Sequence, residues 1–345
     1  MGRYIFGHMR YTVFGAGAIG GTVGAHLARA GLDVLFVDRD ADHVRAMRER
    51  GLTIRGFEAT FTVPVQATGP EALPDRLETV LLAVKAPATE AAVRSFAERL
   101  APDGVVVSLQ NGLNELQIAA LVGAERTIGA FVNFSADYLE PGLIHFGGRG
   151  AFQIGELDGQ ITPRLHALQG ALGHWGRVEV TDNIWGFLWG KQAYGAMLFA
   201  TALTNDSMAD AIDAHRALML ALASEVLQVA SARAVKPLGF DGFEPDIIGS
   251  GDPAAIDAAF DRLIRIRRGD QKTHSGVWRD LAVRKRRTEV DAHFLPVVAE
   301  AERHQLPTPL LRRLIELIHE IEDGERPLDR ANLDELAAAG SVVRA

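Results

Sequence analysis

The segment YTVFGAGAIGG, residues 11–21, decides how the first part of the chain folds. Residues 11–14 are β-prone, and Gly15, Gly17 and Gly20 follow with G-x-G-x-x-G spacing at the opening of a helical pattern. Strand, glycine loop and helix in this order are far more specific than the glycines alone. Gly15 permits a tight turn, Gly17 lets a pyrophosphate approach the backbone, and Gly20 lets the helix lie against the sheet. The segment therefore predicts a dinucleotide-binding loop.

The phosphates of the dinucleotide are expected to lie against the backbone of this loop. The start of a helix offers N–H groups without intrahelical partners, and these attract anions. The backbone residues expected to bind the cofactor are Gly15, Ala16, Gly17, Ala18, Ile19 and Gly20.

The end of the next predicted strand, in LFVDRD (35–40), carries two residues that favour different cofactors. A carboxylate at Asp38 suits the ribose hydroxyls of NAD. A guanidinium at Arg39 suits the extra phosphate of NADP. Capping of the following helix by Asp40 or Asp42 is a structural alternative for this acidic cluster. The sequence leaves NAD and NADP open.

Strand and helix patterns continue to alternate as far as residue 182. The runs at 79–85 and 104–110 read as strands, and Lys85 and Asn111 stand at their carboxyl ends, where ligands of open α/β sheets bind. Both residues are therefore expected to face the nicotinamide half of a cofactor, with a strand end and an Asn-Gly turn as the structural alternatives. The stretch LTIRGFEATFTV (52–63) indicates a small antiparallel insertion.

After residue 182 the pattern changes to long helices. We therefore predict an α/β fold with two domains. Residues 1–182 form an N-terminal dinucleotide-binding domain with a mainly parallel sheet, and residues 183–345 form an all-α domain for substrate binding and dimerisation. The leader MGRYIFGHM has no apolar core, and residues 1–8 are interpreted as a tag remnant.

Composition excludes several functions. The 345 residues carry a formal net charge of −8, which argues against a broad surface for nucleic acid or anionic membranes. The basic cluster at 284–287 is interpreted as a solvated helix face. The chain has no cysteine, so disulfides and thiolate chemistry are excluded and a cytoplasmic location is expected. The 11 histidines show no metal-ligand spacing, and no metal site is predicted.

The apolar run IWGFLWGKQAYGAMLFATALT, residues 184–204, carries a single charge, Lys191. The run is about long enough to span a bilayer, but Lys191, Gln192 and three glycines favour a buried helix in a soluble domain. Burying an unpaired ammonium costs several kcal/mol. The side chain of Lys191 therefore either extends along the helix so that its ammonium reaches solvent, or the ammonium has a chemical function.

Taken together, these motifs resemble the ketopantoate reductase (2-dehydropantoate 2-reductase) family. The matching segments occur in the family's order and are GAGAIGG (15–21), VKAPAT (84–89), LQNGLN (109–114), WGKQAYG (189–195) and RRTEVD (286–291). The resemblance implies a Rossmann-like N-terminal domain, a helical second domain, and an active site in the cleft between them. It also implies NADPH-dependent reduction of a 2-oxo acid to a 2-hydroxy acid, with NAD open because of Asp38.

The resemblance also assigns site residues. It implies that Lys191 is the catalytic acid, with Glu289 beside it at the cofactor and substrate site. Asn111 touches cofactor and substrate, and Ser275 holds the substrate carboxylate. A protonated lysine stabilises the negative charge that forms on a carbonyl oxygen when hydride reaches the carbon, and a carboxylate partner keeps it protonated. A homodimer is expected, since a two-fold dimer is the commonest closed assembly.

Two positions depart from the family pattern. Asparagines that bind substrate in the family are replaced here by Gly195 and Phe199. A 2-oxo acid other than ketopantoate, with a more apolar side chain, therefore stays open as the substrate. The same architecture also suits a hydroxyacid, opine or imine reductase, or a non-catalytic NADPH sensor. Intact Lys191 and Glu289 speak against the sensor, which has no need of a proton donor.

Overall fold

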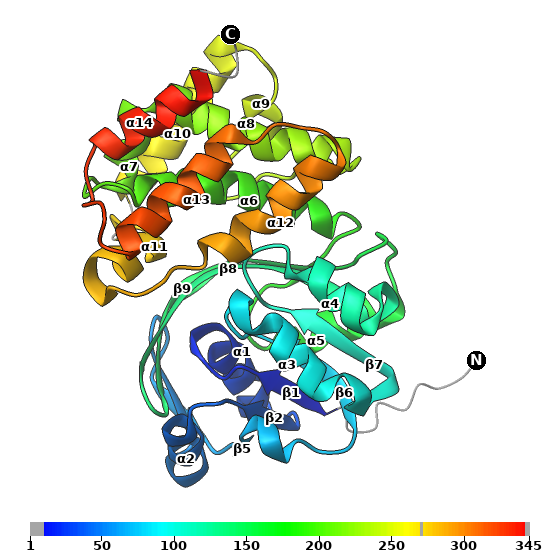
Figure 1. The fold of residues 1–345 in the computed structure, drawn as a ribbon. Coiled ribbons are helices and arrows are strands. Elements are labelled where there is room, and N and C mark those ends of the chain that lie inside the picture. Colours follow the sequence, from blue (N-terminus) through cyan, green and yellow to red (C-terminus); the bar gives the residue numbers. More distant parts are fainter. Residues whose placement is uncertain (1–9, 270–271, 342–345) are drawn as a thin grey trace. The chain divides into compact units, whose positions relative to one another are not determined.

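The computed structural model describes residues 10–269 and 272–341 (Figure 1). The chain forms two compact units, one ending at Ile184 and the other beginning at Trp185. The interpretation of residues 1–8 as a tag remnant concerns residues outside the described part.

The first unit contains a sheet whose central strands are parallel. These strands are buried on both faces, as expected for a sheet covered by helices on each side. Their spatial order is β5-β2-β1-β6-β7-β8, and the direction of the winding reverses between β1 and β6. Ligands of such sheets bind at this reversal. The strands are β1 (Tyr11–Phe14), β2 (Val34–Val37), β5 (Gln66–Thr68), β6 (Leu77–Leu82), β7 (Leu100–Ser108) and β8 (Thr127–Glu140).

A long antiparallel hairpin extends the sheet beyond β8. Strands β8 and β9 (Leu143–Glu156) pair along most of their length and curve strongly (Figure 1). Strand β9 also pairs in parallel with β3 (Leu52–Gly56) and with the short β10 (Glu179–Val180). Strand β3 in turn pairs antiparallel with β4 (Phe61–Val63). The antiparallel insertion predicted at 52–63 is confirmed.

Helices cover both faces of the sheet. On one face the core includes Val13, Phe36 and Val23, on the other Phe14, Val37 and Phe96. Alternate side chains of the same strands thus enter different cores, which is why the strands read as continuous apolar runs. The helices are α1 (Ala18–Arg29), α2 (Ala41–Arg50) and α5 (Pro163–Leu172) on the first face, and α3 (Thr89–Phe96) and α4 (Asn114–Val122) on the second.

The second unit consists of helices and connecting loops in the residues described, with one isolated β-bridge between Phe240 and Phe243. Its helices are α6 (Ile184–Thr201), α7 (Met208–Ala214), α8 (Arg216–Ala232), α9 (Pro245–Ile248), α10 (Pro253–Gly269), α11 (Gly276–Trp278), a π-helical segment (Arg279–Arg284), α12 (Val290–Arg303), α13 (Pro309–Glu322) and α14 (Ala331–Ser341). The α/β fold followed by an all-α unit agrees with the predicted fold class. Within the described residues, no helix is long and apolar enough to cross a membrane.

The helix starts of this unit differ in part from what sequence patterns predict. The pattern TEVD predicts that Thr288 caps α12 through a capping box, but the cap position is Glu289 and the helix starts one residue later. Thr308 does precede α13, yet its side chain does not cap it. Instead the carboxylate of Glu225, on α8, accepts the N–H groups of Leu310 and Leu311, each at 2.9 Å.

The basic cluster at 284–287 is not a helix face. The π-helical segment ends at Arg284, and Lys285 takes a left-handed conformation with φ 47°. The nearly buried carboxylate of Asp280 pairs with Arg284 at 2.8 Å and with Arg286 at 3.0 Å. The arginines thus hold the chain in the turn that leads to Glu289.

Candidate active site

The glycine loop, residues 15–20, lies where β1 and β6 separate. Gly15 has φ +97°, and a Cβ there would lie 2.7 Å from the backbone nitrogen of Val84. A Cβ on Gly20 would lie 2.2 Å from the carbonyl oxygen of Gly15 and 2.8 Å from the Cβ of Ala83. Both glycines are therefore required by close packing of the loop, helix α1 and the chain that leaves β6.

Gly17 is required for a different reason. No described heavy atom outside its own helix and chain neighbours lies within 4 Å of a Cβ placed on it, so the space beside its backbone is open. Gly17 stands at the N-cap of α1, where no side chain caps the helix and the first turn carries no acid. Exposed N–H groups, open space and a first helical turn without an acidic residue fit a bound phosphate.

Asp38 is joined to this loop directly. Its Oδ2 accepts the N–H of Ala16 at 2.8 Å, and its Oδ1 accepts the N–H of Asp40 at 2.9 Å. Arg39 is exposed to solvent. Asp40 caps α2, because its Oδ1 accepts the N–H groups of Asp42 at 3.0 Å and His43 at 3.2 Å. The capping role therefore belongs to Asp40, and Asp38 holds the position expected of the ribose ligand.

The sequence patterns did not identify His43, whose ring contacts the backbone of the glycine loop. Its buried ring lies on α2, with Nε2 2.9 Å from the carbonyl oxygen of Ala16 and Nδ1 3.0 Å from the backbone nitrogen of Gly142. Since the N–H of Gly142 must donate, Nδ1 accepts, and Nε2 carries the proton that it donates to Ala16. His43 thus ties the glycine loop to the turn of the β8–β9 hairpin.

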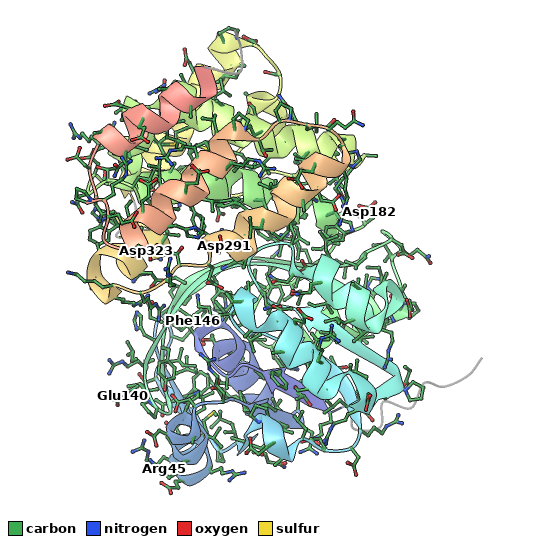
Figure 2. All side chains as sticks on the ribbon, viewed as in Figure 1. Arg45, Glu140, Phe146, Asp182, Asp291 and Asp323 are labelled. Atoms are coloured by element: carbon green, nitrogen blue, oxygen red, sulfur yellow. The ribbon has the colours of Figure 1, made fainter. Side chains whose placement is uncertain are left out.

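The end of the same hairpin packs on α2. Figure 2 shows Glu140 at this end and Arg45 on α2. Tyr138 places its ring edge on His43, with centroids 5.0 Å apart, and its hydroxyl donates to Oδ2 of Asp40 at 3.3 Å. Desolvation raises the pKa of Tyr138 to about 12, together with the negative charges of nearby carboxylates, those of Asp40, Asp38 and Asp42. Three carboxylates, those of Asp40, Asp38 and Asp42, therefore lie near this hydroxyl.

The two other strand ends at the site are joined by three buried polar side chains, Thr89, Gln110 and Asn114, which we call the strand-end network. Gln110 donates from Nε2 to the carbonyl oxygen of Val84 at 2.8 Å and to Oγ1 of Thr89 at 2.7 Å. The Thr89 hydroxyl donates to Oδ1 of Asn114 at 3.2 Å. The Nδ2 of Asn114 donates to the carbonyl oxygen of Asn111 at 2.7 Å.

The direction of this chain of hydrogen bonds is fixed by its ends. Both ends are backbone carbonyls, which only accept, so the two amides and the hydroxyl have one consistent orientation. The network joins the residue before Lys85 to Asn111, and thereby holds the segments after β6 and β7 together. Lys85 itself precedes a short helical turn, 86–88, and Asn111 lies in the exposed turn after β7.

The helical unit carries Lys191 and Glu289. Lys191 lies within α6 and is partly buried, and Glu289 occupies the N-cap position of α12. The two helices are joined next to these residues, because Nε2 of Gln192 donates to the carbonyl oxygen of His293 at 3.0 Å and Oε1 of Gln192 lies 3.2 Å from its Nδ1. Gln192 follows Lys191 directly, and His293 lies one helical turn after Glu289.

The positions of the replaced asparagines lie further along α6. Outside its own helix backbone, a Cβ on Gly195 would find only Oε1 of Gln192 among the described atoms, at 3.8 Å, so this position is open. Phe199 is buried, and its ring lies 5.0 Å from those of His293 and Phe294. Ser275 is also buried, and its Oγ caps α11 by accepting the N–H of Trp278 at 3.1 Å, which leaves its O–H free to donate to another group.

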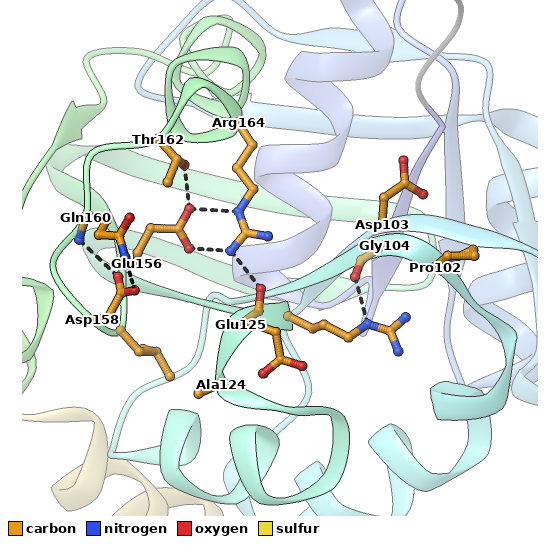
Figure 3. A pocket seen from close by; sticks show the side chains of 12 residues that line it. Pro102, Asp103, Gly104, Ala124, Glu125, Glu156, Asp158, Gln160, Thr162 and Arg164 are labelled. Carbon is orange, nitrogen blue, oxygen red and sulfur yellow. Dashed lines mark hydrogen bonds and ion pairs between the residues drawn. The ribbon is translucent and has the colours of Figure 1, made fainter.

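A hollow of 540 Å³ in the α/β unit is not part of this site (Figure 3). It lies near the amino ends of β7 and β8, away from the glycine loop, and its polar groups satisfy one another. Glu156 accepts from Arg164 at 2.7 Å and from Thr162 at 2.6 Å, and Arg164 also donates to the carbonyl oxygen of Glu125. These contacts account for the hollow as a structural feature. No group of acidic or histidine residues placed to hold a metal ion occurs among residues 10–269 and 272–341.

The fold and the loop define a class of protein, in which a Rossmann-like dinucleotide-binding unit is followed by a helical unit. Within this class, the chain belongs to the ketopantoate reductase PanE/ApbA family. The family's N-terminal model matches residues 11–159, and its C-terminal model matches residues 183–322. The chain is thus a 2-dehydropantoate 2-reductase-like oxidoreductase.

Similar proteins match either most of this chain or about half of it, at low identity. A 2-dehydropantoate 2-reductase of Mesorhizobium japonicum is 27% identical over 91% of this chain and 98% of its own length. One from Pyrococcus horikoshii is 36% identical over 53% of this chain and 60% of its own length. The crystal structure of a PanE/ApbA family ketopantoate reductase from Ralstonia eutropha is 28% identical, covers 92% of this chain and 99% of its own, and has a TM-score of 0.77.

A further solved structure shares the fold. A ternary structure of D-mandelate dehydrogenase with NADH and anilino(oxo)acetate covers 92% of this chain and 99% of its own, with a TM-score of 0.76 at 22% identity. Low identity throughout leaves the substrate of the present chain open.

Proposed function

We propose that this chain reduces a 2-oxo acid to a 2-hydroxy acid with a reduced nicotinamide dinucleotide, and that Lys191 is the proton donor. Family membership across both units, with Lys191 and Glu289 in place, is the observation that carries the proposal. The resemblance implies ketopantoate as substrate and NADPH as coenzyme.

The glycine loop would hold the pyrophosphate of the coenzyme. Support comes from the open space beside Gly17 and from the uncapped start of α1. Lys85 and Asn111 would lie at the nicotinamide half, since they follow strands at the reversal of the winding. A bound reduced nicotinamide supplies hydride to the carbonyl carbon of the acid.

Lys191 would stabilise the negative charge that this transfer creates. Negative charge develops on the carbonyl oxygen, and an ammonium close to it both stabilises the charge and donates a proton. A lysine has a reference pKa of about 10.4, so it is charged at neutral pH. Glu289 would hold the ammonium in its charged form, and the Gln192–His293 contact would fix the two helices that carry the pair.

The substrate would be held by its carboxylate and by its side chain. The Ser275 hydroxyl, with its oxygen used as a helix cap, keeps a proton to donate to a carboxylate. Open space at Gly195 and the buried ring of Phe199 favour an acid with an apolar side chain. Reduction of a different 2-oxo acid or of an imine is therefore the second candidate function.

Absorbance loss of NADPH and NADH, with ketopantoate and a panel of other 2-oxo acids, tests the proposal. Turnover of any of these acids supports it, and turnover of ketopantoate would extend it to the named reaction. If no acid is reduced although both coenzymes bind, the chain is a coenzyme-binding protein and the proposal is wrong. We also propose a cytoplasmic homodimer, which sedimentation analysis of the purified chain and localisation of the tagged chain would test.

A further inference from the structure

Four side chains surround the place where the adenosine ribose of a dinucleotide would lie. They are Asp38 after β2, Asp40 and Asp42 at the start of α2, and Tyr138 from the β8–β9 hairpin, and we call them the ribose-end cluster. All belong to the α/β unit. Hydrogen bonds connect them to one another and to the glycine loop.

Asp38 is held in one orientation and can only accept. Its two oxygens accept backbone N–H groups from Ala16 and Asp40. A carboxylate has about four lone-pair sites, so acceptor capacity remains for further donors. The two ribose hydroxyls of NAD are such donors, whereas a 2′-phosphate, which is anionic at neutral pH, brings charge and acceptors to a group that is both charged and an acceptor.

The start of α2 does not offer a phosphate site either. A helix N-terminus binds anions through its unpaired N–H groups, but here the carboxylate of Asp40 accepts those of Asp42 and His43. The other oxygen of Asp40 accepts the Tyr138 hydroxyl. The helix end that could hold a 2′-phosphate therefore already carries a protein anion.

The local charges add to this effect. Arg45 pairs with Asp42 at 2.6 Å and so does not offset Asp38 and Asp40. Desolvation raises the pKa of Tyr138 to about 12, and the nearby carboxylates of Asp40, Asp38 and Asp42 contribute in the same direction. Arg39 is the one cation of the segment 38–42, which also carries the three carboxylates of Asp38, Asp40 and Asp42.

We propose that the ribose-end cluster makes this chain select NADH over NADPH. The inference rests on the proposed function, since it assumes that the glycine loop holds a nicotinamide dinucleotide. It departs from the NADPH that the family resemblance implies. The selection acts through charge and through the N–H groups at the start of α2, which Asp40 already occupies, and not through the size of the pocket.

Calorimetric titration of the full chain with NADH and NADPH tests the proposal without any turnover. We expect NADH to bind at least about 50-fold more tightly at low salt, because juxtaposed like charges are strongly unfavourable. The ratio should shrink as ionic strength rises. Equal binding, or tighter binding of NADPH, would overturn the proposal.

Asp40→Asn identifies the cause. Asparagine is an equally good helix cap, and its amide can donate to the Tyr138 oxygen, so the local structure should persist with one negative charge fewer. We expect the ratio of NADPH affinity to NADH affinity to rise about fivefold, from a charge interaction at surface dielectric. Glu49→Gln, which removes an exposed charge at the far end of α2, is the matched control. If both variants improve NADPH equally, the cluster is not the determinant.

Failures of the two proposals are distinguishable. Tight NADH binding without turnover of any acid leaves the selection in place and removes the reductase. Turnover of an acid with NADPH as the preferred coenzyme supports the reductase and contradicts the selection of NADH. If neither coenzyme binds, the glycine loop is not a dinucleotide site and both proposals are wrong. The original chain could instead prefer NADPH, with Arg39→Gln lowering its NADPH affinity below its NADH affinity. In that case Arg39 sets the selection and the cluster does not.

Discussion

The glycine loop of the α/β unit and the Lys191 segment of the helical unit are built in opposite ways. In the loop, backbone groups form the site, and glycines serve because side chains would collide or fill it. In the Lys191 segment, one charged side chain in an apolar helix is the proposed proton donor. The first kind of site depends on local geometry, whereas the second depends on which side chains distant helices bring near the lysine.

This difference predicts which substitutions each site tolerates. A backbone site should fail when a Cβ is added, even an apolar one. A side-chain site should tolerate changes in helix packing but fail when its functional group is lost. Substitutions in both units test this contrast, with expected effects that range from a large loss of turnover to a small loss of affinity.

Lys191→Met should lower kcat by about 1,000-fold, because a positioned acid contributes roughly 100- to 10,000-fold. Methionine keeps the length of the side chain and removes only the ammonium, so folding should persist. Steady-state kinetics with the best acid of the panel, alongside circular dichroism, measures this. Lys236→Met, on an exposed lysine of the same unit, is the control. Activity within about tenfold of the original would refute the assignment.

Gly20→Ala and Gly17→Ala should separate folding from binding. The added Cβ at Gly20 meets a backbone oxygen at 2.2 Å, which cannot move cheaply, so we expect about 3 kcal/mol of lost stability. At Gly17 no described atom obstructs it, and stability should stay within about 1 kcal/mol. Coenzyme affinity should nevertheless fall about tenfold or more, since the methyl group enters the space of the phosphate.

Urea unfolding and coenzyme titration of both variants check this pair. A Gly17 variant that binds coenzyme as the original does would show that no phosphate approaches there. A Gly20 variant with unchanged stability would mean that the helix shifts to make room.

Glu225→Gln should change the pH dependence of stability. Desolvation raises the pKa of Glu225 to about 7, although the backbone N–H groups of Leu310 and Leu311 oppose this. Because the folded form holds its proton more tightly than the unfolded form, whose pKa is about 4.5, stability should fall as pH rises from about 4.5 to about 7 and then level off. The full effect is about 3 to 4 kcal/mol.

The glutamine variant removes the titration but keeps only one of the two acceptors that α13 uses, so it should be less stable than the original at pH 4.5, and its stability should not fall as the pH rises to 7. Denaturant melts at several pH values measure this difference. Glu316→Gln, on the exposed side of α13, is the control and should leave the pH profile unchanged. A Glu225 variant with the original profile would place the titration elsewhere.

Thr89→Val should give the smallest effect. It breaks the strand-end network at its centre with little change of shape, and it leaves the Gln110 and Asn114 amides each short of one partner. We expect coenzyme affinity to fall about fivefold, with about 1 to 2 kcal/mol of lost stability. Thr89→Ser keeps the hydroxyl and should restore affinity.

A valine variant that loses stability but binds coenzyme normally would make the network structural only. Calorimetric titration and urea melts of the threonine, serine and valine forms decide between these outcomes.

Much of the α/β unit could be predicted from the sequence. The strands at 79–85 and 104–110 are found at Leu77–Leu82 and Leu100–Ser108, and the insertion after residue 52 is antiparallel. The caps of the helical unit are less predictable. Thr308 has the right position before α13, but a carboxylate 85 residues earlier in the chain does the capping. Spacing rules describe local partners, and this partner is not local.

The sequence by itself determined the glycine loop, the helix that follows it and the acid at residue 38, because their geometry depends on neighbours in the chain. Only the tertiary structure decided that His43 holds the loop through Ala16 and Gly142, positions 27 and 99 residues away. The same is true of the strand-end network and of Tyr138 beside Asp40, 98 residues apart. Buried polar groups must find partners, and folding brings those partners from any part of the chain.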